Sequence, residues 1–163
     1  MRLWHKDLID VLPDKQLISQ WRECCAIVKA IAEKGTPNHI LVNKVCQYPP
    51  NHLYSYTNLV LDEMSRRGFT ISPRSYQNFS VNIENIRYSH GFGPLPINVP
   101  FDDLFAKWHN IHYLTQCFCN LEEKHDCGGI TDKEWEKIKH RYLMIIRDSD
   151  EIRRVNRYGN CRI

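Results

Sequence analysis

The 163-residue chain has no long apolar run, no strong excess of one charge and no internal repeat. Its longest apolar stretch, residues 24–32, is interrupted by Lys29 and is shorter than the roughly 18 residues that span a membrane. The first residues lack the apolar core of a signal peptide, because His5, Lys6 and Asp7 interrupt it. We therefore expect a cytoplasmic protein that does not bind a membrane.

Paired cysteine knuckles are also absent, although the chain contains seven cysteines. Cys117 and Cys119 are separated by one residue, and on a helix this spacing points the two thiols about 200° apart. The alternative, a zinc site in the His- and Cys-rich residues 109–127, is disfavoured by that spacing. We expect free thiols, as is usual in a reducing compartment, and no metal or other cofactor.

The composition is that of a globular protein, with 42% hydrophobic and 25% charged residues. Apolar residues recur at helical spacing in several segments, and glycines or capping residues bound them. Helices are predicted over residues 13–35, 51–67 and 100–125, and from the Thr131/Glu134 capping box onward. Residues 69–100, rich in Asn, Ser, Pro and Gly, are expected to be irregular. The sequence predicts a compact all-α bundle, a single domain over residues 1–163 and a monomer.

The start of the chain carries two groups with chemical potential. Met1 bears the α-amine, which is deprotonated and nucleophilic near neutral pH to a greater extent than a lysine side chain. Glu23 follows Trp21 and Arg22 on the first predicted helix. A nucleophilic amine and a carboxylate are the partners needed for Schiff-base chemistry.

Four short segments in the first 75 residues carry a family resemblance. They are Met1-Arg2-Leu3, Leu12-Pro13-Asp14, Trp21-Arg22-Glu23 and the run LDEMSRRGFTI at 61–71. With these segments the chain resembles the pyrimidine-dimer DNA glycosylases of the endonuclease V type found in phages. The resemblance implies a helical DNA-repair glycosylase with AP-lyase activity that needs no metal.

The same resemblance implies roles for individual residues. In the family, the N-terminal amine attacks the sugar C1′ of a damaged nucleotide, a glutamate assists, and arginines hold phosphates. Carried across, Met1 and Glu23 are catalytic, while Arg2 and Arg22 bind DNA. His5 joins the DNA-binding set because it lies four residues from the amine.

Two departures from the family pattern bear on these roles. The amine is expected to stay on Met1, because the initiator methionine is removed only before small residues and residue 2 is Arg2. A further family arginine falls where this chain has Cys25 and Ala26, so that phosphate contact must come from elsewhere.

The C-terminal region is basic, with eight Lys or Arg residues against three acidic residues in 137–163. Such an excess predicts salt-dependent phosphate contacts with damaged double-stranded DNA. Arg157 and Tyr158 resemble part of the family's aromatic tail, and Arg154 lies beside them. A solvated helix face, a non-catalytic DNA-binding protein, and a lyase acting on other damaged or abasic sites remain alternatives.

Overall fold

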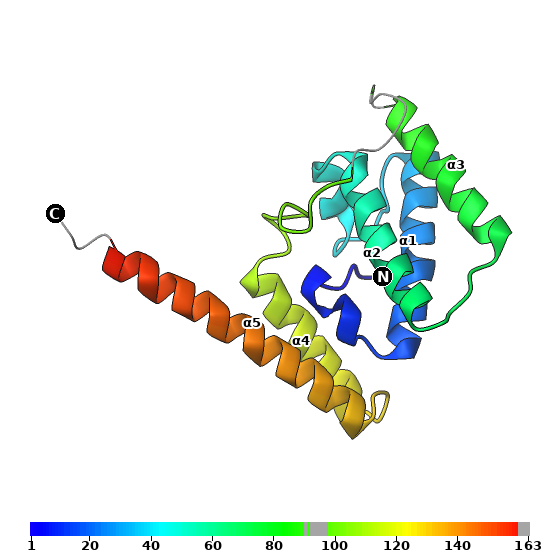
Figure 1. Cartoon of the computed structure of the whole chain (residues 1–163). Coiled ribbons are helices and arrows are strands. Elements are labelled where there is room, and N and C mark those ends of the chain that lie inside the picture. The colour runs from blue at the N-terminus through cyan, green and yellow to red at the C-terminus, as the bar shows by residue number, and fades with distance from the viewer. Residues whose placement is uncertain (90, 92–97, 160–163) are drawn as a thin grey trace.

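The computed structural model describes the backbone of residues 1–89, 91 and 98–159, and the side chains of these residues up to 149. Within this part there are five α-helices, two 3-10 helices and no strand (Figure 1). The elements are η1 (Lys6–Val11), α1 (Asp14–Lys34), η2 (Asn43–Gln47), α2 (Pro50–Arg66), α3 (Pro73–Ser89), α4 (Ile111–Asp126) and α5 (Asp132–Gly159). The predicted all-α class is confirmed. None of the described helices is long and apolar enough to cross a membrane.

The first two α-helices end where the sequence predicts. Gly35 follows α1 with a φ of 74° and donates its amide to the Ile31 carbonyl at 2.8 Å. Gly68 follows α2 with a φ of 79°. Both glycines adopt the left-handed conformation that lets a helix end and the chain turn away.

The prediction of irregular structure over residues 69–100 is wrong for α3. Ser72 accepts the amide of Ser75 at 3.1 Å, and Pro73 occupies the first turn, where its missing N–H costs nothing. Phe79 and Ile83 are buried one turn apart. Most polar residues of α3 are exposed or half-buried, and their number masks this apolar stripe in the sequence. Residues 90 and 92–97 of the predicted irregular segment lie outside the described residues.

The third predicted helix begins later than expected. The chain forms turns before α4, and Phe105 has a φ of 51°, which a continuous helix does not allow. Asn110 then caps α4 by accepting the amide of Tyr113 at 3.0 Å. Leu104 and Trp108 are buried, and they reach the core from turns rather than from a helix.

The predicted capping box at the start of α5 is confirmed. Thr131 donates its amide to Glu134 Oε2 at 2.9 Å, and its hydroxyl accepts the Glu134 amide at 3.4 Å. The first part of α5 packs on α4 and η1, whereas the second part extends away from the bundle (Figure 1). Leu143 and Met144 are 55% and 40% exposed, while the flanking Tyr142 and Ile145 pack against the core.

One contiguous cluster of buried apolar side chains joins the N-terminal segment to the helices. Leu3, Leu8 and Leu12 from the first residues are at most 1% exposed. Each such side chain stabilises the folded state by about 2 kcal/mol through burial. Hydrophobic burial therefore draws the start of the chain into the bundle, close to α1.

Candidate active site

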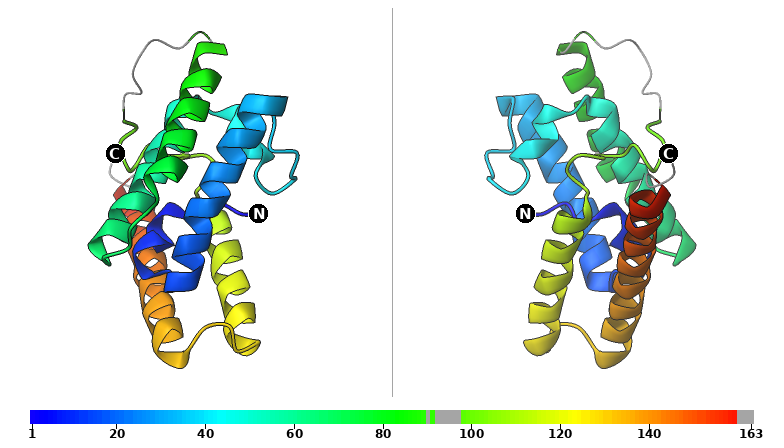
Figure 2. Two further views of the ribbon diagram at one scale, coloured as in Figure 1. Left: turned by 90° about the vertical axis from the view of Figure 1, so that its right-hand side faces the viewer. Right: turned by 90° about the vertical axis from the view of Figure 1, so that its left-hand side faces the viewer.

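The N-terminus emerges on the face between α1 and α4 (Figure 2). Leu3 and Trp4 are buried, at 0% and 6% exposure, whereas Met1 is 42% exposed. Within residues 1–4, only the residues before Leu3 are therefore accessible to solvent. A free amine at this position is accessible while the segment behind it is fixed.

The structure brings this chain end to Glu23. The Arg2 amide donates a hydrogen bond of 2.7 Å to Glu23 Oε2. The Met1 and Arg2 nitrogens are joined by three covalent bonds, which span about 4 Å at most, so the Met1 nitrogen lies within about 7 Å of that oxygen. Glu23 is half-buried, and its Oε1 has no hydrogen-bond partner among the described residues. The amine and carboxylate can therefore act on one reacting group.

Three side chains hold the two residues that follow Arg2. Gln20 Oε1 accepts the Trp4 amide at 2.9 Å, the Tyr113 hydroxyl donates to the Leu3 carbonyl at 2.5 Å, and the Tyr56 hydroxyl donates to the Trp4 carbonyl at 2.7 Å. Burial raises the pKa of both tyrosines well above its usual range, so both hydroxyls remain protonated donors. No sequence motif identifies Tyr113 or Gln20 as part of the site. Only their hydrogen bonds to the N-terminal segment, made from two different helices, identify them.

Arg2 lies beside the site with a half-buried side chain. Its guanidinium is 5.6 Å from the centre of the Trp4 ring, and Nη1 is 4.0 Å from Cys117 Sγ. Burial is the largest cause that raises the pKa of the Cys117 thiol, which therefore stays protonated and is a poor nucleophile. The Arg2 cation is thus directed toward α4.

Arg22 is exposed on α1 beside Glu23 and starts a polar track. Lys29 follows it seven residues later, on the same face of the helix. A hollow of about 720 Å³ lies between α1 and α3 and is lined by Lys29, Glu33, Arg74, Gln77, Asn78, Val81 and Asn82. Cys25 Sγ lies 4.0 Å from Ser75 Oγ, which places the first turn of α3 near Arg22. The sequence did not identify Arg74, because α3 itself was missed.

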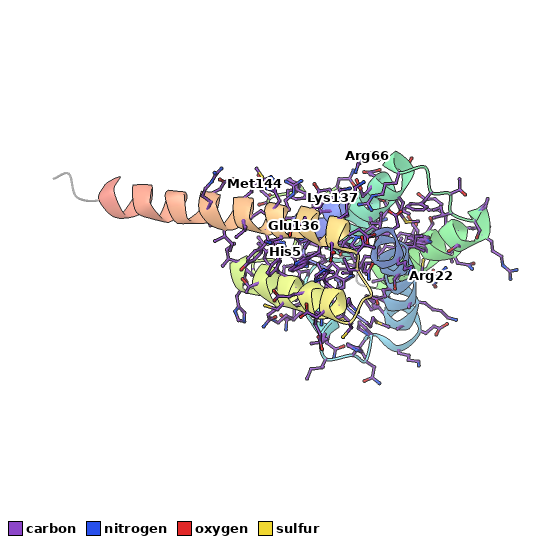
Figure 3. The ribbon with its side chains drawn as sticks, turned by 90° about the horizontal axis from the view of Figure 1, so that it is seen from below. His5, Arg22, Arg66, Glu136, Lys137 and Met144 are labelled. Carbon is purple, nitrogen blue, oxygen red and sulfur yellow. The ribbon has the colours of Figure 1, made fainter. Side chains whose placement is uncertain are left out.

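His5 was predicted to bind DNA, but the structure places it inside the bundle (Figure 3). Its side chain is 2% exposed, its ring stacks on His109 at 5.1 Å, and its Nδ1 accepts the Asp7 amide at 3.3 Å. Burial lowers the pKa of both histidines. His5 caps η1 from the core, so its ring cannot reach a ligand at the surface.

Three further predicted contacts belong to the end of α5. The side chains of Arg154, Arg157 and Tyr158 lie outside the described residues, and their backbone belongs to α5. The far end of α5 lies apart from the N-terminus in every view (Figures 1 and 2). Within the described residues, no three His, Cys, Asp or Glu side chains come together as a metal site.

Comparison with known proteins adds one match. Residues 1–77 of this 163-residue chain match the family described as pyrimidine dimer DNA glycosylase, and no curated protein or solved structure matches the chain. The matched segment contains Met1, Arg2 and Glu23 of the exposed chain end, and Arg22, which precedes Glu23 on α1. The first 77 residues, just under half of the chain, are therefore similar to the pyrimidine dimer DNA glycosylase family.

Proposed function

We propose that the protein is a glycosylase for pyrimidine dimers in double-stranded DNA, with AP-lyase activity that depends on an N-terminal amine. The observation that carries this proposal is the 2.7 Å hydrogen bond from the Arg2 amide to Glu23, which ties the chain end to the one carboxylate of the family's Arg-Glu pair. Neither group requires a metal for this chemistry.

In the proposed reaction, the neutral Met1 amine attacks C1′ of the 5′ nucleotide of the dimer. The glycosidic bond breaks and its electron pair leaves with the base, while the new C–N bond forms. Loss of a proton from nitrogen and opening of the sugar ring then give an imine. Removal of a C2′ proton expels the 3′ phosphate by β-elimination, and water releases the amine.

Glu23 has two roles in this scheme. As a carboxylate it stabilises the positive charge that develops at the sugar, and it then accepts and returns protons during ring opening and elimination. The Arg2 amide binds Oε2, which leaves Oε1 to interact with the sugar. A carboxylate fixed in this way reorients little as charge develops.

The DNA is proposed to lie across Arg22 and the hollow between α1 and α3. Arg74 and Lys29 provide cations there, and Asn78 and Asn82 provide amide groups that bind phosphates and sugars. This track replaces the phosphate contact that Ala26 cannot make. We propose additional contacts to the DNA backbone from the end of α5, because extended basic segments bind phosphates without a close fit. The residues concerned are Arg154, Arg157 and Tyr158.

Borohydride trapping on duplexes with a dimer or an abasic site tests the proposal, because only an amine catalyst leaves a reduced covalent adduct. Glu23→Gln is expected to lower strand cleavage by about 100-fold or more while DNA binding changes little. Glu122→Gln, which changes an exposed glutamate of α4, serves as the matched control.

The pattern of outcomes separates the alternatives. Adducts with abasic DNA but not with dimers would replace the proposal with a lyase for abasic sites. Binding without any adduct would indicate a non-catalytic DNA-binding protein. Equal loss of cleavage in Glu23→Gln and Glu122→Gln would show that Glu23 has no catalytic role.

A further inference from the structure

The peptide group between Leu3 and Trp4 is held from both of its sides. Its N–H donates to Gln20 of α1, and its carbonyl accepts the Tyr113 hydroxyl of α4. The next carbonyl accepts the hydroxyl of Tyr56 of α2. Three helices thus fix two consecutive residues directly behind the proposed catalytic amine.

Tyr113 is itself held in place by its surroundings. It is 8% exposed, and its ring lies 5.4 Å from Trp108 and 5.2 Å from His109. Asn110 accepts its backbone amide in the cap of α4. The packing of its ring and the cap of α4 therefore fix the position of the Tyr113 hydroxyl that binds Leu3.

Tyr113 also lies outside residues 1–77, the segment that matches the glycosylase family. Gln20 and Tyr56 lie within that segment, so the hold on the N-terminal residues is shared between the matched and unmatched parts of the chain. Met1 is two residues from Leu3, and a small rotation of the Leu3–Trp4 peptide moves the amine relative to Glu23. Covalent catalysis is sensitive to displacements of about 1 Å.

We propose that Tyr113 is a positioning residue, which holds the Leu3–Trp4 peptide so that the Met1 amine faces the sugar beside Glu23. This inference rests on the proposed amine chemistry. Tyr113 touches no substrate; it acts through the Leu3 carbonyl. The C-terminal half of the chain thereby contributes to a site whose reacting groups all come from the first 23 residues.

The test compares Tyr113→Phe with Tyr142→Phe. Both remove one hydroxyl that forms a hydrogen bond: the Tyr113 hydroxyl bonds the Leu3 carbonyl, whereas the Tyr142 hydroxyl lies 3.1 Å from Thr115 Oγ1. Under single-turnover conditions, Tyr113→Phe is expected to lower the maximal trapping rate by about tenfold. The DNA concentration at half-maximal rate stays within about twofold, because DNA contacts are unchanged. Tyr142→Phe stays within about twofold in both quantities.

Hydrogen exchange of the Trp4 amide gives a readout that does not need activity, because this amide belongs to the peptide that Tyr113 holds. Its exchange is expected to be about tenfold faster in Tyr113→Phe and unchanged in Tyr142→Phe. If the wild-type protein forms no adduct, the proposed function fails, and unchanged exchange would separately show that Tyr113 does not hold the segment.

An unchanged maximal rate in a folded Tyr113→Phe protein would overturn the inference, even if exchange became faster. An equal loss of rate in Tyr142→Phe would also overturn it, because the effect would then be one of general stability. Should Tyr113→Phe fail to fold, Tyr56→Phe removes the neighbouring hydrogen bond to the Trp4 carbonyl and is judged by the same two readouts.

Discussion

The two ends of this chain are built in opposite ways. The N-terminal residues are buried within one residue or two of the terminus, and side chains from α1, α2 and α4 hold their peptide groups. The far part of α5 extends from the bundle (Figure 3), beyond Tyr142 and Ile145, which still pack against the core. A reacting amine must be fixed to within about 1 Å, whereas a basic segment attracts phosphates over a Debye length of about 8 Å. Under the proposed function, the fixed N-terminus would carry the chemistry and the basic end of α5 would only attract DNA.

The largest effect is expected from modifying the two ends in turn. Acetylating the Met1 amine, or adding one residue before it, is expected to lower borohydride trapping by about 100-fold or more, because an amide is not nucleophilic and a shifted amine is displaced by about 3.5 Å. The same extension after Ile163 is expected to change trapping by less than about threefold. Mass spectrometry verifies each terminus.

Full activity with a verified blocked N-terminus would contradict the Met1 assignment. The nearest lysine in sequence, Lys6, is not a ready substitute. Its side chain is buried, and its Nζ donates to the carbonyls of Phe101 and Asp102, the latter at 3.0 Å. The nucleophile would then have to be sought on another lysine.

The buried and exposed faces of α5 should also differ in their effect on stability. Ile138 is 0% exposed, so Ile138→Ala is expected to lower the free energy of unfolding by about 2–5 kcal/mol. Leu143 is 55% exposed, and Leu143→Ala should change it by less than about 0.5 kcal/mol. Denaturant unfolding measures both. Similar losses would mean that the exposed face of α5 around Leu143 is covered in solution.

The N-terminal segment should become less stable as the pH falls. The pKa values of His5 and His109 are lowered chiefly by burial, so the folded protein favours the neutral rings and the unfolded chain binds more protons below its histidine pKa of about 6.5. The stability that these buried neutral histidines contribute is complete above that pH. It is lost as the pH falls below it, by up to about 1.4 kcal/mol per pH unit for each histidine.

Unfolding midpoints between pH 7.5 and 5 measure this dependence. His109→Gln should flatten the profile, while His112→Gln, which changes an exposed histidine of α4, should not. Identical profiles for all three proteins would show that the buried histidines do not govern acid stability.

The smallest expected effects are on the salt dependence of DNA binding. Arg22→Ala, Arg74→Ala and Arg154→Ala should each reduce the slope of log K against log salt by about one, because each removes about one phosphate contact. Arg66→Ala is the control, since that guanidinium already pairs with Glu63 at 2.7 Å. An unchanged slope in Arg154→Ala would leave the end of α5 without a role in binding.

Much of the fold follows from local patterns in the sequence. The ends of α1 and α2 and the start of α5 depend on glycine and capping residues that act over a few residues, so they were predictable. α3 was missed although Ser72, Pro73 and the spacing of Phe79 and Ile83 indicate a helix, because its polar surface resembles a loop. α4 was placed too early because the conformation of Phe105 is set by packing and not by local preference.

For the candidate site, the sequence by itself determined the chemical groups: the Met1 amine, Glu23 and its neighbour Arg22 stand within a recognisable segment. The tertiary structure decided which groups meet. It buried His5, which looked accessible, and brought Tyr113 to Leu3 across 110 positions of sequence. Short-range signals specify residue types and helix ends, but a hydrogen bond between distant helices exists only because burying the shared core holds those helices together.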